Sequence, residues 1–495
     1  MRTVGSGRAG LAAMVVCVLL GGCAVGPDFV QPAPPKVERY TAAALPGAIG
    51  GRDTGTSFVV AEDIPTRWWS AFRSDPLDRL IRAAVSNNPS LQAADAALKL
   101  AQYNALAQRG LYLPQLAASY GPSTQLTSNF ETSDVPQQRY SLHTAQLTIA
   151  YTLDVWGANA RAVESLDAVT EQQHFQLEAA HLSLTANIVT AAVGEASLRG
   201  QIAATQRIVT IERDILRILK SQFEAGQAAQ VDVLSQQAAL AQVEQTLPPL
   251  EKQLAIQRDL LTALAGEPSA AGIPQRFELA QLALPRDIPV LLPATLVRHR
   301  PDVRAAEANL HAVSAQVGVA VAARLPNIAI GGSTAGASAY KFAQLFAPGT
   351  GFYVLAANAT QPIFDGMTLL NKQHAAEAGL RQADAQYRQA VISALQNVAD
   401  ALQSLSIDAR LVRSAIKAET AAHASLDIVR QQLTLGQVNQ VAVLNAQQTY
   451  LNAAITRVQA EATRLSDAVA LFMAIGGGWP RDCKAADWRS CVLDG

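Results

Sequence analysis

The stretch Gly226-Gln-Ala-Ala-Gln230-Val-Asp-Val-Leu decides the fold, because it returns as Gly436-Gln-Val-Asn-Gln440-Val-Ala-Val-Leu, at an offset of 210 residues. Both copies share the pattern Gly-Gln-x-x-Gln-Val-x-Val-Leu. Each lies between long segments rich in Ala, Gln and Leu, a composition typical of helices. A glycine just past one helix and just before another predicts a tight turn. We therefore interpret the two copies as the tips of two helical hairpins.

Other landmarks recur in the same order and at nearly the same offset, which indicates an internal duplication. The paired landmarks are Asn88-Pro89 with Arg300-Pro301, Leu113-Pro114 with Leu325-Pro326, Gly157 with Gly366, and Leu264-Ala-Gly266 with Ala474-Ile-Gly476. The two halves are expected to fold alike.

The spacing between landmarks predicts very long helices. From Gly157 to Gly226 and from Gly366 to Gly436 the chain could form helices of about 100 Å at 1.5 Å per residue. Isoleucines at 208, 211, 215 and 218 have the spacing of a coiled-coil seam. An ordinary helical bundle is the alternative, but helices of this length exceed the globular norm.

The pattern changes from helix to strand between Leu113 and Gly157, and again at 327–338 and 352–363. Leu147, Ile149, Tyr151 and Leu153 alternate with polar or small residues. Alternating strands of about 10 residues fit an outer-membrane β-barrel, with a soluble hairpin as the alternative. Four strands cannot close a barrel, since the smallest have about 8. Three chains together would supply about 12 strands.

The first residues predict export. Arg2 and Arg8 precede the apolar run 9–20, which is typical of a signal peptide and too short to span a membrane. Leu20-Gly-Gly22-Cys23 resembles a bacterial lipobox, which implies cleavage between Gly22 and Cys23 and attachment of lipid, such as palmitate, to Cys23. An ordinary signal peptide with an incidental cysteine is the alternative. Ala24, in place of Asp, favours sorting to the outer membrane.

The residue types in two further segments, one near each end of the sequence, predict local features. Residues 24–57 are rich in Pro, Gly and Ala, so we expect an extended, semi-stiff segment that can lead away from a lipid without packing. Near the end, Cys483 and Cys491 could form a disulfide in an oxidising periplasm. A metal site there is the alternative, but no His or further Cys lies nearby in the sequence.

Composition argues against nucleic-acid binding, because the net charge is −1 and no basic patch is evident. The seven histidines are scattered, and neither a His-Glu-x-x-His motif nor a Ser/His/Asp signature is present. We therefore predict no catalytic residues, no metal and no cofactor.

Several stretches together resemble the TolC-like outer membrane factor family, and in particular its NodT-type efflux lipoproteins. They are Cys23-Ala-Val-Gly-Pro-Asp-Phe, Trp68-Trp69-x-x-Phe72-x-x-Asp-Pro-Leu, and Gln361-Pro-Ile-Phe-Asp-Gly366. The resemblance implies an α+β membrane protein with two internal repeats. Its coiled-coil helical barrel would adjoin a 12-strand β-barrel that trimerisation completes.

The duplication and the resemblance give the following domain organisation: a lipoprotein signal peptide at 1–22, a lipidated extended N-terminus and first helix at 23–88, repeat 1 at 89–270, a Pro-rich equatorial linker at 271–299, repeat 2 at 300–476, and a tail at 477–495.

The resemblance also implies site residues at the periplasmic tips, where an adaptor would dock. These are Gly226, Gln230, Val231, Asp232, Leu234, Gly436, Gln440, Val441 and Leu444. Some members of the family carry acidic rings inside the tip, contributed by the second turn. Here Ala442 and Asn445 are uncharged, which argues against a gate built on two Asp rings. Candidates for the pore constriction are Asp232, Asn439 and Asn445. For Asp232 the alternative is a charge favoured by the helix dipole.

The implied function is an outer membrane channel of a tripartite system that exports drugs or other toxic small molecules. The expected partners are two further copies of the chain, a periplasmic adaptor, a proton-driven inner-membrane transporter, and outer membrane lipid. The protein would be lipid-anchored and membrane-spanning, with a large periplasmic part. The alternatives are the outer membrane duct of a type I protein secretion system and, in a different class, a periplasmic coiled-coil scaffold lipoprotein without a channel.

Overall fold

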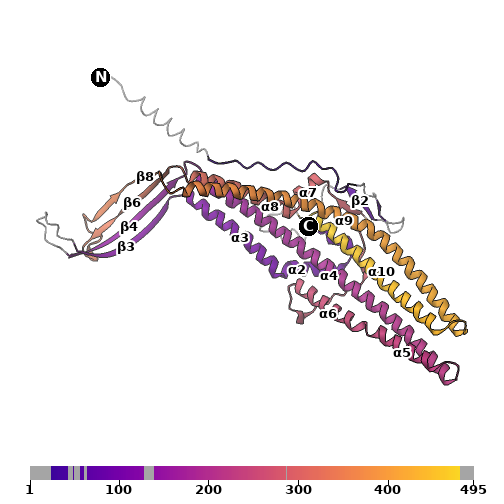
Figure 1. The fold of residues 1–495 in the computed structure, drawn as a ribbon. Helices are drawn as coiled ribbons and strands as arrows, with labels where there is room; N and C mark the ends of the chain where they lie inside the picture. The colour runs from indigo at the N-terminus through magenta and orange to yellow at the C-terminus, as the bar shows by residue number, and fades with distance from the viewer. Residues whose placement is uncertain are drawn as a thin grey trace. The chain divides into compact units, whose positions relative to one another are not determined.

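A computed structural model describes residues 24–42, 48–49, 56–60, 64–126, 139–285 and 287–479. It contains long helices, a sheet of five strands and a small sheet of three (Figure 1). The chain divides into two compact units. The sheet unit comprises residues up to 32, 97–173 and 305–388, and the helical unit comprises 33–96, 174–304 and 389 onward.

The sheet unit holds five antiparallel strands in the order β3-β4-β6-β7, with β8 also paired to β6. Their bounds are β3 Gln115–Leu126, β4 Arg139–Leu153, β6 Asn327–Ala339, β7 Gly351–Val354 and β8 Asn358–Thr360. Strands from the two halves of the chain therefore pair directly, through β4 and β6. The prediction of β structure between Leu113 and Gly157, and again after residue 327, is confirmed.

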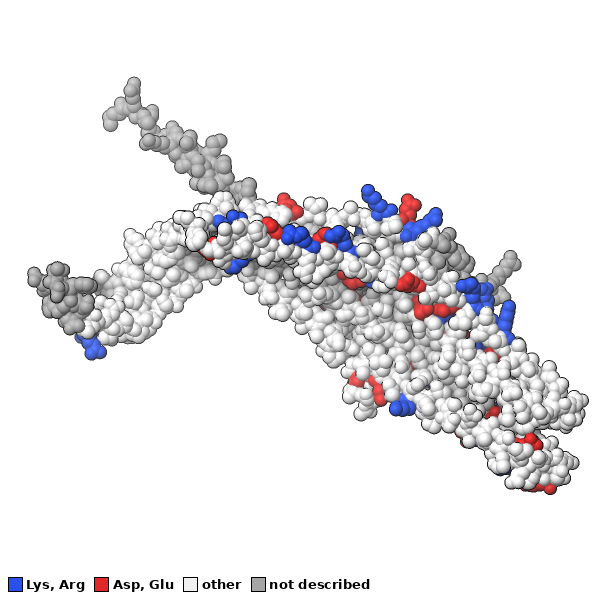
Figure 2. Space-filling view, viewed as in Figure 1, with Lys and Arg blue, Asp and Glu red and all other residues white. Residues whose placement is uncertain are grey.

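The pairing register gives this sheet one apolar and one more polar face. Leu116 lies opposite Ile149, and Ala118 lies opposite Leu147. Residues one position on belong to the other face, where Ser119 lies opposite Gln146. Arg139 is the sole charged residue in these five strands. In Figure 2 the strands are accordingly almost white, whereas charged side chains gather over the helices.

The predicted strand 352–363 is wrong as a continuous strand, because β7 and β8 are separate short pieces. Between them the Ser333 hydroxyl takes over the backbone pairing, accepting from Ala356 N at 3.2 Å and donating to Ala356 O at 3.3 Å. The preceding residue, Gly332, has a φ of 69°, which bends β6 at this point. A side chain has thus replaced part of the ladder.

Two long helices begin in the sheet unit and continue in the helical unit. They are α4 (Ala158–Glu224) and α9 (Thr368–Thr434), each of 67 residues, as the landmark spacing predicted. An aspartate caps the first turn of each helix. Asp154 Oδ1 accepts from Asn159 N at 2.8 Å, and Asp365 Oδ2 accepts from Leu369 N at 2.8 Å.

The returning helices differ between the halves. In the first half, α5 (Gln230–Glu244) and α6 (Leu247–Leu264) are separated at Gln245 and Thr246, and prolines occupy the first turn of α6. In the second half, α10 (Gln440–Ala474) continues for 35 residues. Pro248 and Pro249 have no backbone N–H to donate, so they suit a helix start and break a helix interior.

The remaining helices are α2 (Asp75–Asn87), α3 (Pro89–Arg109), α7 (Pro293–His299) and α8 (Pro301–Ala322). Short 3-10 turns lie at η1 (Trp68–Phe72), η2 (Gly110–Tyr112), η3 (Ser269–Ala271), η4 (Leu279–Gln281) and η5 (Phe342–Gln344). Within the described ranges, none of the helices combines the length and apolarity that a membrane crossing requires.

A second, smaller sheet in the helical unit was not predicted. Its order is β1 (Ala48–Ile49), β2 (Thr56–Val60), β5 (Asp287–Val290), and β2 runs parallel to β5 with Phe58 opposite Ile288. Tyr40 also donates its hydroxyl to Leu291 O at 2.7 Å. The expectation of a segment without packing is therefore wrong, because residues 24–57 bind partners that lie more than 130 residues away in the sequence.

The helical unit buries an aromatic cluster. Trp68, Trp69 and Phe72 are 0–1% exposed. The Trp68 ring stacks on Phe472 of α10, with 5.2 Å between ring centroids. Trp69 Nε1 donates to Asp78 Oδ1 at 3.0 Å. Trp68 therefore joins α10 to the segment that precedes α2, and Trp69 joins this segment to α2 itself.

The seam of α4 is shifted from its predicted positions. Ile208 and Ile215 are buried at 1% and 3%, but Ile218 is 37% exposed and Leu219, at 3%, takes its place. Glu212 is buried at 2% one turn after Ile208. The seam thus follows 208, 212, 215 and 219, and its second position is polar.

Candidate functional sites at the hairpin turns and the N-terminal segment

Both hairpin turns use the same cap. Gly226 has a φ of 70° and Gly436 a φ of 68°, a left-handed conformation that favours glycine. Gly226 N donates to Phe223 O at 2.9 Å, and Gln227 N donates to Gln222 O at 2.8 Å. The corresponding bonds after α9 measure 3.0 and 2.9 Å. These paired bonds form a Schellman motif, which satisfies carbonyls at the helix end and reverses the chain.

The helices that leave the two turns begin differently. Asn439 precedes α10, and its Oδ1 accepts from Ala442 N at 3.1 Å. The equivalent residue before α5 is Ala229, whose side chain has no acceptor. Asp232 lies in the first turn of α5, where a negative charge interacts favourably with the helix dipole.

Apolar side chains are exposed just after both turns. Val231 is 64% exposed, Leu234 54% and Val441 59%. Gln230 is exposed and Leu444 half-buried. We call Val231, Leu234 and Val441 the tip patch. These residues of the predicted docking set are accessible in a single chain.

Gln440 differs from the rest of that set, because it is buried at 4% inside the helical unit. Its Nε2 donates to Oε1 of Gln236 on α5, and Gln236 Nε2 donates to Oε2 of Glu212 on α4. Gln236 Nε2 also donates to Glu212 O at 3.1 Å. The amide of Gln440 is thus engaged inside the chain, and a docking role for this residue stays a prediction.

Burial raises the pKa of Glu212 to about 7, and the hydrogen bond from Gln236 opposes part of this rise. A carboxyl in an apolar seam favours its neutral form, because ionisation would place a charge where water cannot solvate it. Glu212, Gln236 and Gln440 thus form a polar layer, called here the seam relay, that joins the first hairpin to the second.

The three candidates for a pore constriction have different surroundings. Asn445 and Asn439 are exposed, and Asn439 Oδ1 is used as a helix cap. Asp232 is half-buried. Their role in a constriction remains a prediction, because it depends on neighbouring copies of the chain.

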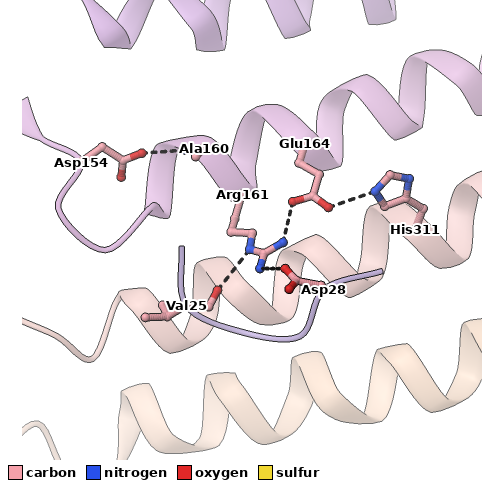
Figure 3. A network of polar contacts seen from close by, with 7 residues as sticks. All are labelled: Val25, Asp28, Asp154, Ala160, Arg161, Glu164 and His311. Atoms are coloured by element: carbon pink, nitrogen blue, oxygen red, sulfur yellow. Dashed lines mark hydrogen bonds and ion pairs between the residues drawn. The ribbon is translucent and has the colours of Figure 1, made fainter. Parts of the chain in front are cut away.

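A second polar network in the sheet unit fixes the start of the described chain (Figure 3). Arg161, near the start of α4, has a side chain only 6% exposed. It donates to Val25 O at 3.2 Å, to Asp28 Oδ1 at 2.5 Å and to Glu164 Oε2 at 2.8 Å. Glu164 also contacts His311 Nε2 at 3.0 Å.

Glycines make room for this N-terminal segment. A Cβ on Gly318 of α8 would lie 2.8 Å from both Arg161 Cγ and Val25 O, and one on Gly157 would lie 2.7 Å from Ala24 Cα. A Cβ on Gly26 would meet the backbone of Gly318. Val25 N donates to Trp156 O at 3.1 Å. We call this arrangement the N-terminal cradle.

Some predicted residues lie outside the described part of the chain. These are Gly22 and Cys23 at the predicted cleavage and lipidation site, and Cys483 and Cys491 of the predicted disulfide. In the residues that the structure does describe, no group of three or more His, Cys, Asp or Glu side chains is placed to hold a metal ion.

Sequence reasoning missed both polar networks. The cradle has a local signal, because a glycine lies three residues after Asp154 and another directly after Asp365, but nothing near Arg161 identifies Val25 as its partner. The seam relay has a weaker local signal. Gln440 lies within the second copy of the duplicated stretch, and Gln236 lies just after the first copy.

Two paired hairpins, each joined to antiparallel strands in a duplicated chain, define the class of outer membrane channel proteins with long helical extensions. A family model described as "Outer membrane efflux protein" matches residues 80–267 and 292–477, which is more than half of the chain. The chain belongs to this family and is an outer membrane protein.

Known relatives extend over nearly the whole length. The pyoverdine export outer membrane protein OpmQ of Pseudomonas aeruginosa is 29% identical over 484 residues, covering 95% of this chain and 97% of the relative. Outer membrane protein OprJ of the same species is 27% identical over 479 residues, covering 95% and 96%. "Nodulation protein T" of Rhizobium leguminosarum bv. trifolii is 25% identical, covering 94% and 97%.

Solved structures share the fold. The outer membrane protein VceC of Vibrio cholerae aligns with a TM-score of 0.76 at 25% identity, covering 84% of this chain and 99% of that one. The CmeC outer membrane channel of Campylobacter jejuni aligns with a TM-score of 0.84 at 19% identity, covering 95% and 98%. The predicted family and the predicted α+β fold with two internal repeats are confirmed, whereas closure of a 12-strand barrel by trimerisation stays a prediction.

Proposed function

We propose that the protein is the outer membrane duct of a tripartite efflux system and passes toxic small molecules from the periplasm to the outside. The observation that carries this proposal is the pairing of an amphipathic sheet with two matched helical hairpins in one duplicated chain. The sheet supplies an apolar face for lipid and a more polar face for a lumen. The family membership agrees with this function.

The duct would need more than one chain. A single chain leaves the outer edges of its sheet, at β3 and at β7 and β8, without a pairing partner within the described residues. Exposed sheet edges favour pairing with another chain. We therefore propose a homotrimer in which neighbouring copies close the barrel, with Cys23 lipidated at the same membrane.

The tip patch would bind the periplasmic adaptor. Val231, Leu234 and Val441 are exposed apolar side chains on the turns that the duplication repeats. Small apolar anchors surrounded by polar residues are common at protein interfaces. An inner-membrane transporter would supply cargo and energy, and we favour a proton-driven transporter. The duct itself would carry out no catalysis.

Small molecules are favoured over secreted proteins as cargo because the relatives are named for them. Two relatives are a pyoverdine export protein and a toluene efflux pump protein. The alternative of a scaffold lipoprotein gives no reason for an amphipathic five-stranded sheet.

The proposal is tested in a strain that lacks the gene, grown on a panel of solvents, dyes and antibiotics. Wild-type protein should restore growth, whereas V231D/V441D protein should not, although it reaches the membrane in equal amount. V30D is the matched control, since Val30 is 80% exposed and lies far from the turns in sequence. Full resistance with V231D/V441D would overturn the docking role, and no change on deletion would overturn efflux.

Purified wild-type protein in planar bilayers gives a second, independent test. Trimers that conduct ions would support the duct, and a non-conducting monomer would favour the scaffold.

A further inference from the structure

The seam relay interrupts an otherwise apolar contact between the two hairpins. On the side of the turns, Val443 of α10 packs with Ile215, Leu219 and Val233. On the other side, Leu451 packs with Ile208, Val209 and Val243. Glu212 on α4 and Gln236 on α5 lie between these clusters, and Gln440 lies one turn before Val443 on α10. The three side chains are 2%, 0% and 4% exposed. Water is therefore excluded from the relay while the hairpins are packed.

The relay contains the hydrogen bond that crosses between hairpins at this level, from Gln440 Nε2 to Gln236 Oε1. The direction of this bond follows from the chemistry. Glu212 accepts from the Gln236 amide nitrogen, so the Gln236 amide oxygen is turned towards Gln440 and can only accept. The carboxyl on α4 thus orients the amide that holds α10.

The same seam contains a destabilising group. Gln447, two turns after Gln440, is 1% exposed, and neither its amide oxygen nor its amide nitrogen has a hydrogen-bond partner. A buried unpaired amide disfavours the packed arrangement, because separation would return it to water. The apolar clusters and the relay together must offset this cost, so a change at the relay shifts the balance between packed and separated hairpins.

We propose that Glu212 is a proton-binding site that couples protonation to the packing of the two hairpin tips: the protonated carboxyl keeps them together, and its ionisation lets them separate. The packed-to-separated step transfers the carboxyl proton to water and breaks the Gln440–Gln236 hydrogen bond. Gln236 and Gln447 then bond to water. The coupling between protonation and packing does not depend on the proposed duct function. Only the inference that separated tips open a duct rests on that function.

The direction of the coupling follows from burial. Packed, Glu212 has a pKa of about 7, whereas in water the ordinary value is about 4.5. The packed state holds its proton to higher pH, so protons favour packing. This stabilisation is complete below about pH 4.5 and is lost as the pH rises through about 7.

Other charged groups on the surrounding helices do not replace this effect. On α4 and α5, Arg213 pairs with Glu244 at 2.7 Å, and on α4 Arg217 pairs with Asp214 at 3.4 Å. On α9, His423 pairs with Asp427 at 3.0 Å, and Arg430 lies one turn further on. Asp232 is the acidic residue of the first turn of α5, and α10 carries no ionisable side chain from Gln440 to Gln448. None of these is a cause of the raised pKa of Glu212, which burial raises and the hydrogen bond from Gln236 partly lowers.

The test measures the separation of the tips directly. Spin labels are placed at Gln227 and Gln437, which follow the two turn glycines, in full-length protein with Cys483 and Cys491 replaced by serine. Distance distributions between the labels are recorded from pH 5 to pH 9. Wild-type protein should move from a short to a longer distance with a midpoint near pH 7, and E212Q, which keeps a neutral side chain of the same shape, should stay short throughout.

Two controls separate the relay from general effects. E244Q removes an exposed carboxylate one helix away, and its pH response should match that of the wild type. Q440M keeps the side-chain volume but removes the inter-hairpin bond, so the separated fraction at pH 6 should rise about fivefold, the equivalent of one net hydrogen bond. Q440M also keeps the test decisive if E212Q fails to fold.

Distances that do not change with pH in the wild type, or a pH response that persists in E212Q, would overturn the proton site. Channel conductance recorded on the same samples keeps the two proposals apart. If the tips respond to pH but the protein never conducts, the proposal of a proton site is supported and the proposal of a duct is contradicted.

Discussion

Arg161 on α4 binds Asp28 across 133 residues of sequence, with 2.5 Å between Nη2 and Oδ1. The two ends of this ion pair differ in exposure, at 6% for the Arg161 side chain and 89% for Asp28. The buried partner belongs to a long helix and the exposed partner to the N-terminal segment. The helix therefore provides a fixed site to which the segment binds.

Replacing Arg161 with alanine should release this segment. The change removes hydrogen bonds to Val25 O, Asp28 and Glu164, and we expect a loss of about 2 kcal/mol, reduced from the buried-pair value because Asp28 is exposed. Hydrogen–deuterium exchange of the Val25 amide should accelerate. R109A is the control, since Arg109 and Asp167 form an exposed pair, at 50% and 44%. Unchanged exchange in R161A would contradict the binding site.

A single methyl group at Gly318 should have a similar effect. Alanine normally favours a helix over glycine by about 1 kcal/mol. At Gly318, however, its Cβ would lie 2.8 Å from Val25 O, so G318A should destabilise the protein and expose the N-terminal segment. G379A is the matched control on α9, where the nearest atom, Val313 Cγ1, lies at an ordinary 3.6 Å. Thermal unfolding of the two variants should shift in opposite directions, and a stabilised G318A would refute the close contact.

Trp68 should be among the most sensitive positions of the helical unit. It is 1% exposed and stacks on Phe472, so W68A should cost about 3–5 kcal/mol through lost burial and a cavity. Guanidinium unfolding followed by circular dichroism measures this loss. F346A removes an aromatic ring that is 84% exposed and should change stability little. Equal midpoints for W68A and the wild type would argue against the aromatic cluster.

Acid should weaken the helical unit through His181. Burial lowers the pKa of this imidazole to about 4 from an ordinary value of 6.5. The unfolded chain then binds the proton more readily, so stability is complete above about pH 6.5 and falls by about 3 kcal/mol as the pH drops towards 4. H181F keeps the aromatic packing against Trp69 and Trp479 and should flatten this part of the stability profile. H423F, at an exposed site, should not, and an identical slope in H181F would show that other groups dominate.

Helix lengths and stop positions were predictable because their signals are local. Gly226 and Gly436 favour a backbone conformation that ends a helix, and the same cap recurs at Gly266 and Gly476. The prolines at 248 and 249 are a local signal of the same kind, because they lie where α6 begins after the break from α5. Each of these signals acts through the residue's own backbone, so no distant partner is needed to interpret it.

The polar networks were not predictable for the opposite reason. The isoleucine spacing assigned the α4 seam to 211 and 218, but packing selects Glu212 and Leu219. The carboxyl of Glu212 is accommodated at a seam position because the amide of Gln236 on α5 donates to it, and Gln440 on α10 in turn donates to Gln236. Similarly, β2 and β5 pair over more than 200 residues, and Ser333 replaces a stretch of ladder, although neither sequence shows its partner.

α4 and α9 have the same length, 67 residues each, so a change in the length of one half of the chain affects its fit to the other half. Deleting seven residues from α4 alone would shorten this helix by about 10 Å. Glu212 would then be displaced from Gln440 by about two helical turns. Removing seven from both would leave them level. Insertions or deletions in one of the two long helices should therefore persist only with a change of equal length in the other, so that each half of the duplicated chain constrains the length of the other half.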